Sequence, residues 1–222
     1  RARRWPAGPP GAAMPEPRRR LNMRALRYDR FGPPAVLHVA SVAVPAPGPG
    51  ELSVRVAAAG LNPLDGKIRD GQLRWLPLLA RPPRGVGTDF AGTVEAVGPG
   101  IDAYAPGDRV FGSLSPLARQ GSFAEVVVVR PDRIARVPAG VSLETAAALP
   151  VAAGTAVQAL TDDVALGAGQ RVLVTGAAGG VGAAAVQYAT HLGASVTGVC
   201  SASNAGHVRA LGAFFFNDTA TT

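Results

Sequence analysis

The chain has 222 residues, of which 47% are hydrophobic and 17% charged, and it contains one cysteine. This composition is typical of a globular protein and excludes the intrinsically disordered and collagen-like classes. A single cysteine excludes an intrachain disulfide framework, a four-cysteine zinc site and an iron–sulfur site. No run of about 18 apolar residues occurs without a breaker. We therefore expect no membrane partner and a cytoplasmic location.

The net charge of +7 is concentrated at the N-terminus. Residues 1–22 hold six arginines and one glutamate, whereas the other 200 residues carry 16 basic and 14 acidic side chains. The body of the chain therefore has no electrostatic reason to bind phosphate backbones, and we expect no nucleic-acid partner. Residues 1–22 also contain five prolines and no apolar periodicity. We interpret them as a disordered leader or upstream read-through, with a targeting segment as the alternative.

Short β runs punctuated by glycine and proline fill the next part of the chain, residues 23–140. Five runs have strand character: residues 36–44, 51–59, 92–97, 108–111 and 123–130. Turn signals separate several of them, at residues 48–50, 98–100 and 106–108. Many short strands at this spacing predict a small β-barrel.

From residue 141 the pattern changes to alternating helices and strands. Ser142 is a suitable N-cap for a helix that begins at Leu143. The pattern then predicts four more elements: a strand at 171–175, a helix ending near 192, a strand at 195–199 and a helix at 205–211. This order is typical of the first part of a doubly wound parallel sheet.

A glycine-rich loop joins the strand at 171–175 to the helix that follows it. In the dinucleotide-binding register, Gly179 lets the backbone approach a pyrophosphate, and Gly182 lets the helix pack closely against the strand. The candidate cofactor-binding residues of the loop are Gly176, Ala178, Gly179, Gly180, Val181 and Gly182. The alternative is that these glycines only close a tight turn.

The residues after the second strand favour NADP over NAD. An acidic side chain about 20 residues beyond the loop would hold the ribose hydroxyls of NAD, but residues 165–216 contain no Asp or Glu. Ser201 and Ser203 follow the strand instead, and their hydroxyls can accept a 2′-phosphate without charge repulsion. We therefore expect NADP as the cofactor, although no Lys or Arg adjoins Ser201.

Six ordered motifs within residues 23–213 resemble the zinc-independent quinone oxidoreductases, the zeta-crystallin-like branch of the medium-chain dehydrogenase/reductase superfamily. The motifs are residues 60–65, 87–92, 106–111, 121–125, 147–150 and 177–182, the last with Gln187. The resemblance implies a GroES-like, partly open β-barrel at residues 23–140, which is the catalytic domain. It also implies the first part of a Rossmann doubly wound parallel sheet at residues 141–213, and a homodimer when the protein is full length.

Zinc-dependent members of that superfamily carry Cys where this chain has Asn62, and His-Glu where it has Asp89 and Phe90. Catalytic zinc needs three convergent Cys, His or carboxylate ligands, and the only cysteine, Cys200, lies in a predicted strand of the second domain. We therefore expect no metal site. Hydride transfer to a quinone or to an activated alkene needs no Lewis acid. The predicted function is NADPH-dependent reduction of a quinone or an enone.

The resemblance also implies roles for individual residues. Asn62 would lie where the nicotinamide and the acceptor meet, and Thr155 would contact the nicotinamide amide. Lys67, the only lysine, is the second catalytic candidate, as a proton donor or an oxyanion partner. Each residue has a simpler interpretation: Asn62 as a helix N-cap, Thr155 as an ordinary helix residue and Lys67 as a solvated side chain.

Two other functions stay open. One is a non-catalytic NADPH-binding protein, of a structural or RNA-binding kind. The other is an enoyl reductase module of a polyketide or fatty-acid synthase, which would share the fold.

Residues 214–222 match no part of the family pattern and resemble translated sequencing-adapter sequence. We interpret them as a non-native tail and the chain as truncated at its C-terminus. Only two strands of a six-stranded dinucleotide sheet are then predicted. We expect such a chain to be inactive, and to be poorly soluble or to bind NADPH weakly.

Overall fold

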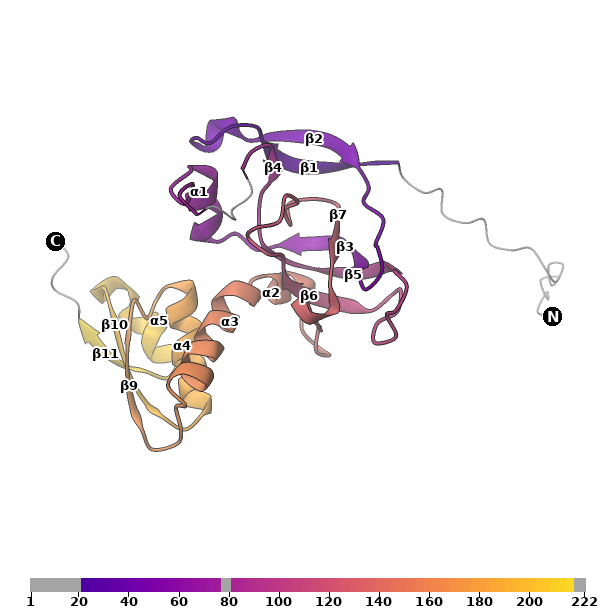
Figure 1. Ribbon diagram of the computed structural model, residues 1–222. Helices are drawn as coiled ribbons and strands as arrows, with labels where there is room; N and C mark the ends of the chain where they lie inside the picture. The colour runs from indigo at the N-terminus through magenta and orange to yellow at the C-terminus, as the bar shows by residue number, and fades with distance from the viewer. Residues whose placement is uncertain (1–20, 77–80, 218–222) are drawn as a thin grey trace, which may run out of the picture.

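The computed structural model describes residues 21–76 and 81–217, which form two lobes joined by two consecutive helices (Figure 1). The predictions for residues 1–20 and 218–222 lie outside the described residues. The α-helices are α1 (Pro63–Arg69), α2 (Leu143–Ala147), α3 (Pro150–Gln158), α4 (Gly180–His191) and α5 (Ala205–Ala210). Short helical turns lie at η1 (Pro34–Val36), η2 (Pro131–Arg133), η3 (Ala159–Asp163) and η4 (Ala202–Asn204). None of the helices within the described ranges is long and apolar enough to span a bilayer.

The larger lobe contains two sheets. Its strands are β1 (Asn22–Tyr28), β2 (His38–Ala43), β3 (Leu52–Ala59), β4 (Arg84–Gly85), β5 (Asp89–Val97), β6 (Arg109–Ser113), β7 (Val126–Val129) and β8 (Ile134–Arg136). One sheet has the order β2-β1-β4, and the other has the order β7-β3-β5-β6-β8. Neither order returns to its first strand within the described residues, so the barrel is open, as predicted.

The core of the larger lobe comes from alternate residues of the five-stranded sheet. Strand β5 pairs antiparallel with both β3 and β6, so its inward side chains meet those of two neighbours. The buried cluster consists of Leu52, Val54, Phe90, Val94, Val110, Leu114, Val127 and Val129. Each large apolar side chain buried in this way contributes about 1.5–3 kcal/mol. The cluster therefore holds the ends of β3 and β5 in place, and the site described below is built on those ends.

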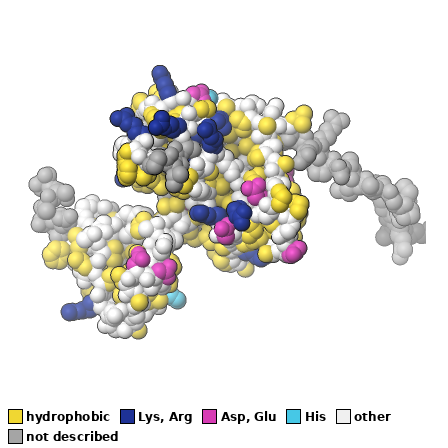
Figure 2. All heavy atoms as spheres, viewed as in Figure 1, with side chains coloured by type: hydrophobic (Ala, Val, Ile, Leu, Met, Phe, Trp, Pro, Cys, Tyr) yellow, Lys and Arg dark blue, Asp and Glu magenta, His cyan; other side chains and the backbone are white. Residues whose placement is uncertain are grey.

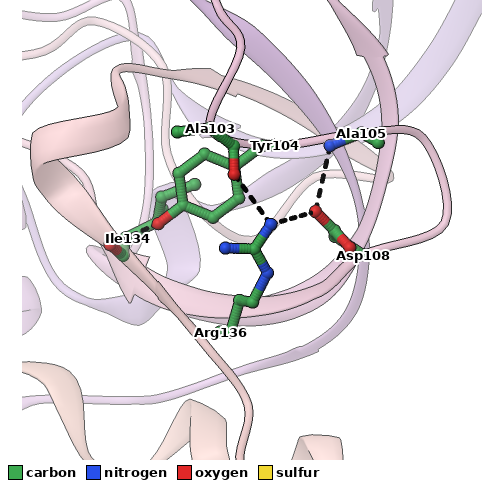
Figure 3. Close-up of polar contacts among 6 residues, drawn as sticks. All are labelled: Ala103, Tyr104, Ala105, Asp108, Ile134 and Arg136. Carbon is green, nitrogen blue, oxygen red and sulfur yellow. Dashed lines mark hydrogen bonds and ion pairs between the residues drawn. The ribbon is translucent and has the colours of Figure 1, made fainter.

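A polar network fastens β8 to the turn before β6 (Figure 3). The Asp108 carboxylate accepts from the backbone N–H of Ala105 and from the Arg136 guanidinium, both at 2.9 Å. These two donors, Ala105 first, hold the pKa of Asp108 below its ordinary value. The guanidinium lies 4.8 Å from the centroid of the Tyr104 ring, whose hydroxyl donates to the backbone oxygen of Ile134 at 3.1 Å. The last strand of the lobe is therefore held by side chains as well as by its sheet.

Helices α2 and α3 carry the chain from the larger lobe to the smaller one (Figure 1). The predicted N-cap is confirmed, since the Ser142 hydroxyl accepts from the backbone N–H of Thr145 at 3.1 Å. Ala147 is buried against Ala91 of β5, and these small side chains let α2 lie close to the sheet. Leu149 keeps helical dihedral angles (φ −89°, ψ −38°), so the chain passes from α2 into α3 without an extended linker.

The smaller lobe is a three-stranded parallel sheet with helices on one face. Its strands are β9 (Arg171–Thr175), β10 (Ser195–Cys200) and β11 (Phe214–Asn217), in the order β11-β10-β9. Side chains of α4 and α5, among them Val186 and Val208, pack into one buried cluster with Val196 of β10. The predicted first part of a Rossmann sheet is confirmed.

The number of strands predicted for this sheet is wrong. Phe214–Asn217, which the sequence placed in a tail outside the fold, form β11 and pair in parallel with β10. The physical reason is the period of two that strand residues follow. Phe215 packs against the cluster under the helices, whereas Phe214 and Phe216 point to the opposite face. Alternation of this kind makes three successive phenylalanines compatible with a parallel strand.

The face of this three-stranded sheet that lies opposite α4 and α5 has no covering layer among the described residues. Leu173, Phe214 and Phe216 are 63%, 71% and 61% exposed, and Leu173 and Phe214 both pair with Thr197 of the central strand. Figure 2 shows hydrophobic atoms at the surface of the smaller lobe, beside the grey C-terminal trace. We call these three side chains the open face.

Candidate active site

Asn62 and two aspartates meet where α1 begins beside the start of β5. The Asn62 amide, through Nδ2, donates to the Asp89 carboxylate at 3.0 Å and lies 3.5 Å from the Thr88 hydroxyl. The backbone N–H of Asn62 donates to the Asp65 carboxylate at 2.8 Å. Asn62 is thus the N-cap residue of α1, as its simpler interpretation held. Its amide in addition ties α1 to β5.

A hollow of about 640 Å³ opens beside these residues. Six apolar side chains line most of its wall: Leu26, Leu37, Leu61, Pro63, Val86 and Phe123. The polar residues of the lining are Asn62, Asp65 and Arg69. Small-molecule pockets have this size and this mixture of an apolar wall with a few polar groups. The hollow therefore suits a largely apolar molecule with one polar edge.

Asp65 is the titratable group most affected by its position in the site. It is 5% exposed, and burial raises the pKa of its carboxyl. The N–H of Asn62 opposes that increase, and the nearby Asp89 adds to it. Asp65 also lines a separate cavity of about 10 Å³ with Tyr28 and Arg84, which is close to the room that one water needs. This carboxyl therefore keeps a proton at a higher pH than an exposed aspartate does.

Lys67 is not brought together with Asn62. Its side chain is exposed on the outer side of α1, and it does not line the hollow. Of the two catalytic candidates, only Asn62 lies at the wall of the hollow.

The glycine loop needs glycine at two of its positions. Gly176 adopts φ +67°, a left-handed conformation that glycine tolerates best. A Cβ at Gly182 would lie 2.1 Å from the backbone oxygen of Gly176, so only glycine lets α4 start this close to the end of β9. Gly179 is the N-cap of α4, and the first N–H groups of the helix, from Gly180, Val181 and Gly182, have no acceptor within the helix. These N–H groups can receive a phosphate.

Ser201 and Ser203 lie together at the carboxyl end of β10. Their hydroxyl oxygens are 3.1 Å apart, and the Asn204 amide donates to Ser201 at 3.0 Å. The end of β10 adjoins the end of β9, where the glycine loop begins. Arg209 does not complete the cluster, since its guanidinium lies over the Phe215 ring at 4.9 Å from the centroid. The carboxyl end of β10 thus carries neutral hydroxyls and an amide.

Thr155 is exposed on α3, the helix that packs beside α4. A Cβ added at Gly180 would lie 3.7 Å from the Ala152 side chain, which is ordinary contact. The helix that carries Thr155 therefore borders the glycine loop, while its first turn reaches the larger lobe.

The roles of Asp65 and Asp89 were missed by the reasoning from sequence. The sequence does contain a signal for Asp89. A carboxylate at the start of a strand that continues with apolar Phe90 and Ala91 is expected to be buried, and a buried carboxylate needs a hydrogen-bond partner. Within residues 21–76 and 81–217, no three or more His, Cys, Asp or Glu side chains gather in a way that could hold a metal ion.

Comparisons with known proteins agree with this architecture. The model of the alcohol dehydrogenase GroES-like domain matches residues 48–139. A chloroplastic quinone-oxidoreductase homolog of Spinacia oleracea is 43% identical over 86% of this chain and 59% of its own length. The structure of the quinone oxidoreductase from Coxiella burnetii has a TM-score of 0.78 and 34% identity, covering 87% of this chain and 61% of that one.

A pikromycin polyketide synthase component of Streptomyces venezuelae is also similar, with 43% identity over 74% of this chain and 4% of its own length. The chain spans about three fifths of the two quinone oxidoreductase relatives. The family model lies within the larger lobe, and each of the two relatives matches more than four fifths of this chain, so the similarity includes parts of both lobes. Over the part of those proteins that it spans, this chain is therefore similar in sequence and in fold to the quinone oxidoreductase branch of the medium-chain dehydrogenase/reductase superfamily.

Proposed function

We propose that the whole protein is an NADPH-dependent oxidoreductase that delivers hydride to a quinone or to an enone without zinc. The observation that carries the proposal is the hollow at Asn62, which is mostly apolar and lies on the lobe that α3 joins to the glycine loop. A flat, apolar acceptor with a carbonyl edge matches that lining. For the full-length protein we also propose a homodimer in the cytoplasm.

Different residues of this chain bind the cofactor and the acceptor. A bound dihydronicotinamide supplies the hydride. The N–H groups at the start of α4 hold the pyrophosphate, and Thr155 orients the nicotinamide amide. Asn62 contacts the acceptor at the wall of the hollow. Asp65 lies in the same wall and holds the start of α1 by accepting from the Asn62 N–H.

The proposed preference for NADPH rests on Ser201 and Ser203. Because no carboxylate stands at this position, the 2′-phosphate meets hydroxyls instead of a like charge. We expect NADPH to bind more tightly than NADH in calorimetric titrations. Ser201→Asp should reverse that preference, since it adds a negative charge beside the phosphate. Ser195→Asp is the control, because Ser195 is also exposed and lies at the other end of β10. Equal affinity of the unaltered protein for the two dinucleotides would contradict the NADPH assignment.

Zinc independence rests on the donor chemistry at the start of α1 and β5. Asn62 presents an amide that is already bonded to Asp89, and an amide is a poor zinc ligand beside thiolate and imidazole. Quinone reduction by the full-length protein should therefore be unchanged after dialysis against a chelator. Loss of turnover that added zinc restores would show the proposal to be wrong.

The similarity to the polyketide synthase component favours a second candidate, an enoyl reductase acting on a thioester-bound alkene. Both candidates transfer hydride to an electron-poor carbon, so the assay has to separate the acceptors. Faster NADPH oxidation with a short enoyl thioester than with a simple quinone would support this second function.

A further inference from the structure

Asp89 joins the beginnings of two helices from different lobes. It is the first residue of β5 and is 1% exposed. Its Oδ2 atom accepts from Asn62 Nδ2 and from the backbone N–H of Val151, each at 3.0 Å. Asn62 begins α1 in the larger lobe, whereas Val151 lies in the first turn of α3, which continues into the smaller lobe. A single carboxylate oxygen therefore links the hollow to the helix that carries Thr155.

The α3 group that donates to Asp89 is the first backbone N–H of this helix. Pro150, its first residue, has no N–H, so the N–H of Val151 is the first donor at that end. The start of a helix carries partial positive charge, and a carboxylate accepting from it forms a charge-assisted hydrogen bond. The other Asp89 oxygen, Oδ1, is buried without a hydrogen-bond partner among the described residues. The two N–H donors at Oδ2 are therefore what hold this buried side chain.

The backbone around Asp89 is closely packed, so the link between α1 and α3 has little room to shift. The N–H of Gly60 donates to the backbone oxygen of Asp89 at 3.0 Å. A Cβ at Gly60 would lie 2.5 Å from the backbone oxygen of Ala147 and 3.0 Å from the Asp89 Cβ. The end of β3, the start of β5 and the end of α2 are thus in direct contact, and the Asp89 side chain reaches α3 from that fixed base.

We propose that Asp89 is a positioning residue, which sets α3 and Thr155 relative to Asn62 and the hollow. The inference rests on the proposed function, because it concerns how the cofactor and acceptor sites are aligned. Asp89 does not touch the acceptor: it does not line the hollow. It acts through the two groups that it holds.

Hydrogen exchange on the 222-residue chain tests the link without any turnover. Asp89→Ala removes the acceptor, so we expect the Val151 amide to exchange about tenfold faster. Asp89→Asn keeps an acceptor oxygen and should bring exchange at Val151 back towards the unaltered rate. Asp108→Ala is the matched control, because the Asp108 carboxylate accepts from Ala105 and Arg136, away from the starts of α1 and α3. Unchanged exchange at Val151 in Asp89→Ala would overturn the proposal, and so would equal acceleration throughout β5.

Turnover of the full-length protein separates this proposal from the proposed function. Asp89→Ala should lower kcat more than it raises KM for the quinone, because Asp89 is itself no part of the lining of the hollow. Asp89→Asn should recover part of kcat. If the unaltered protein reduces no quinone while the exchange result holds, the function is wrong and the link stands. If Asp89→Ala turns over as fast as the unaltered protein, the positioning role is wrong.

Discussion

Gly66 lies inside α1, on the side of the helix that lines the hollow. A Cβ at this position would meet no heavy atom within 4 Å, and the backbone φ is not left-handed. Neither backbone conformation nor packing therefore requires glycine, although glycine inside a helix destabilises by about 0.5–1 kcal/mol relative to alanine. The physical effect of the missing side chain is extra room in the hollow.

Gly66→Ala should raise the free energy of unfolding by about 0.5–1 kcal/mol in urea titrations, because alanine favours the helical state. Gly66→Leu should fill part of the hollow and slow bulky quinones more than small ones. Gly92→Ala is the control, since its Cβ would lie 2.0 Å from the Arg55 backbone oxygen, and it should lower stability. A destabilised Gly66→Ala would show that the helix needs this glycine.

Asp65 gives the stability of the protein a pH dependence of known sign. Burial raises the pKa of its carboxyl in the folded state above an ordinary value of about 3.9. The folded state therefore binds the proton more tightly than the unfolded state, and stability falls as pH rises from about 4 through the raised pKa.

Asp65→Asn removes this titration but keeps an acceptor for the Asn62 N–H. The free energy of unfolding of Asp65→Asn, measured relative to the unaltered protein, should increase with pH across that window and then stay level. Asp108→Asn should show the opposite slope, because the pKa of Asp108 is lowered by Ala105 and Arg136. Urea titrations at a series of pH values compare the two, and parallel slopes would contradict the assignment.

At the scale of elements, local patterns were more predictable than long-range ones. Strand β9 has the predicted bounds, and α4 and β10 end within one residue of theirs, because a strand, a glycine loop and a helix are read from neighbouring residues. Strand β5 begins at Asp89, three residues before the predicted strand. Its carboxylate is accommodated by Asn62 and Val151, and no local pattern reveals those two partners. The same holds for the hollow, whose lining comes from five separate segments.

The turn between β9 and α4 depends on one glycine contact. In Gly182→Ala the new Cβ would lie 2.1 Å from the Gly176 oxygen, so α4 has to move away from the strand that it packs on. We expect dinucleotide affinity, measured by calorimetry, to fall by at least about tenfold, since the phosphate-binding N–H groups move with the helix. Gly180→Ala makes only ordinary contact with Ala152 and should keep its fold. Equal affinities in the two variants would argue against this loop as the cofactor site.

For the whole molecule, the open face is the largest departure from a covered sheet. Leu173 of β9 and Phe214 and Phe216 of β11 present aliphatic and aromatic surface on one face of the sheet, and the outer edge of β9 is unpaired within the described residues. Contiguous apolar surface of this kind promotes association, and an unpaired strand edge adds to that tendency.

Light scattering should therefore show an apparent mass that increases with the concentration of this chain. The double variant Phe214→Ser with Phe216→Ser should reduce that increase, because it removes the two most exposed aromatic side chains of the face. Val39→Ser, at a side chain that is 68% exposed on β2 of the other lobe, should leave it unchanged. Association that persists in the double variant would place the contact elsewhere.

The strand order also determines when each part of the chain can assemble during synthesis. Strands β9, β10 and β11 pair in the order in which the ribosome makes them, so each finds its neighbour as it emerges. Strand β3 has to wait for β7 before its second edge is paired. Asp89 has to wait as well, since Val151 follows it by 62 residues. Until α3 emerges, the nascent larger lobe holds this carboxylate with only one of its two donors, and a chain released before that point is less stable than its sheets alone imply.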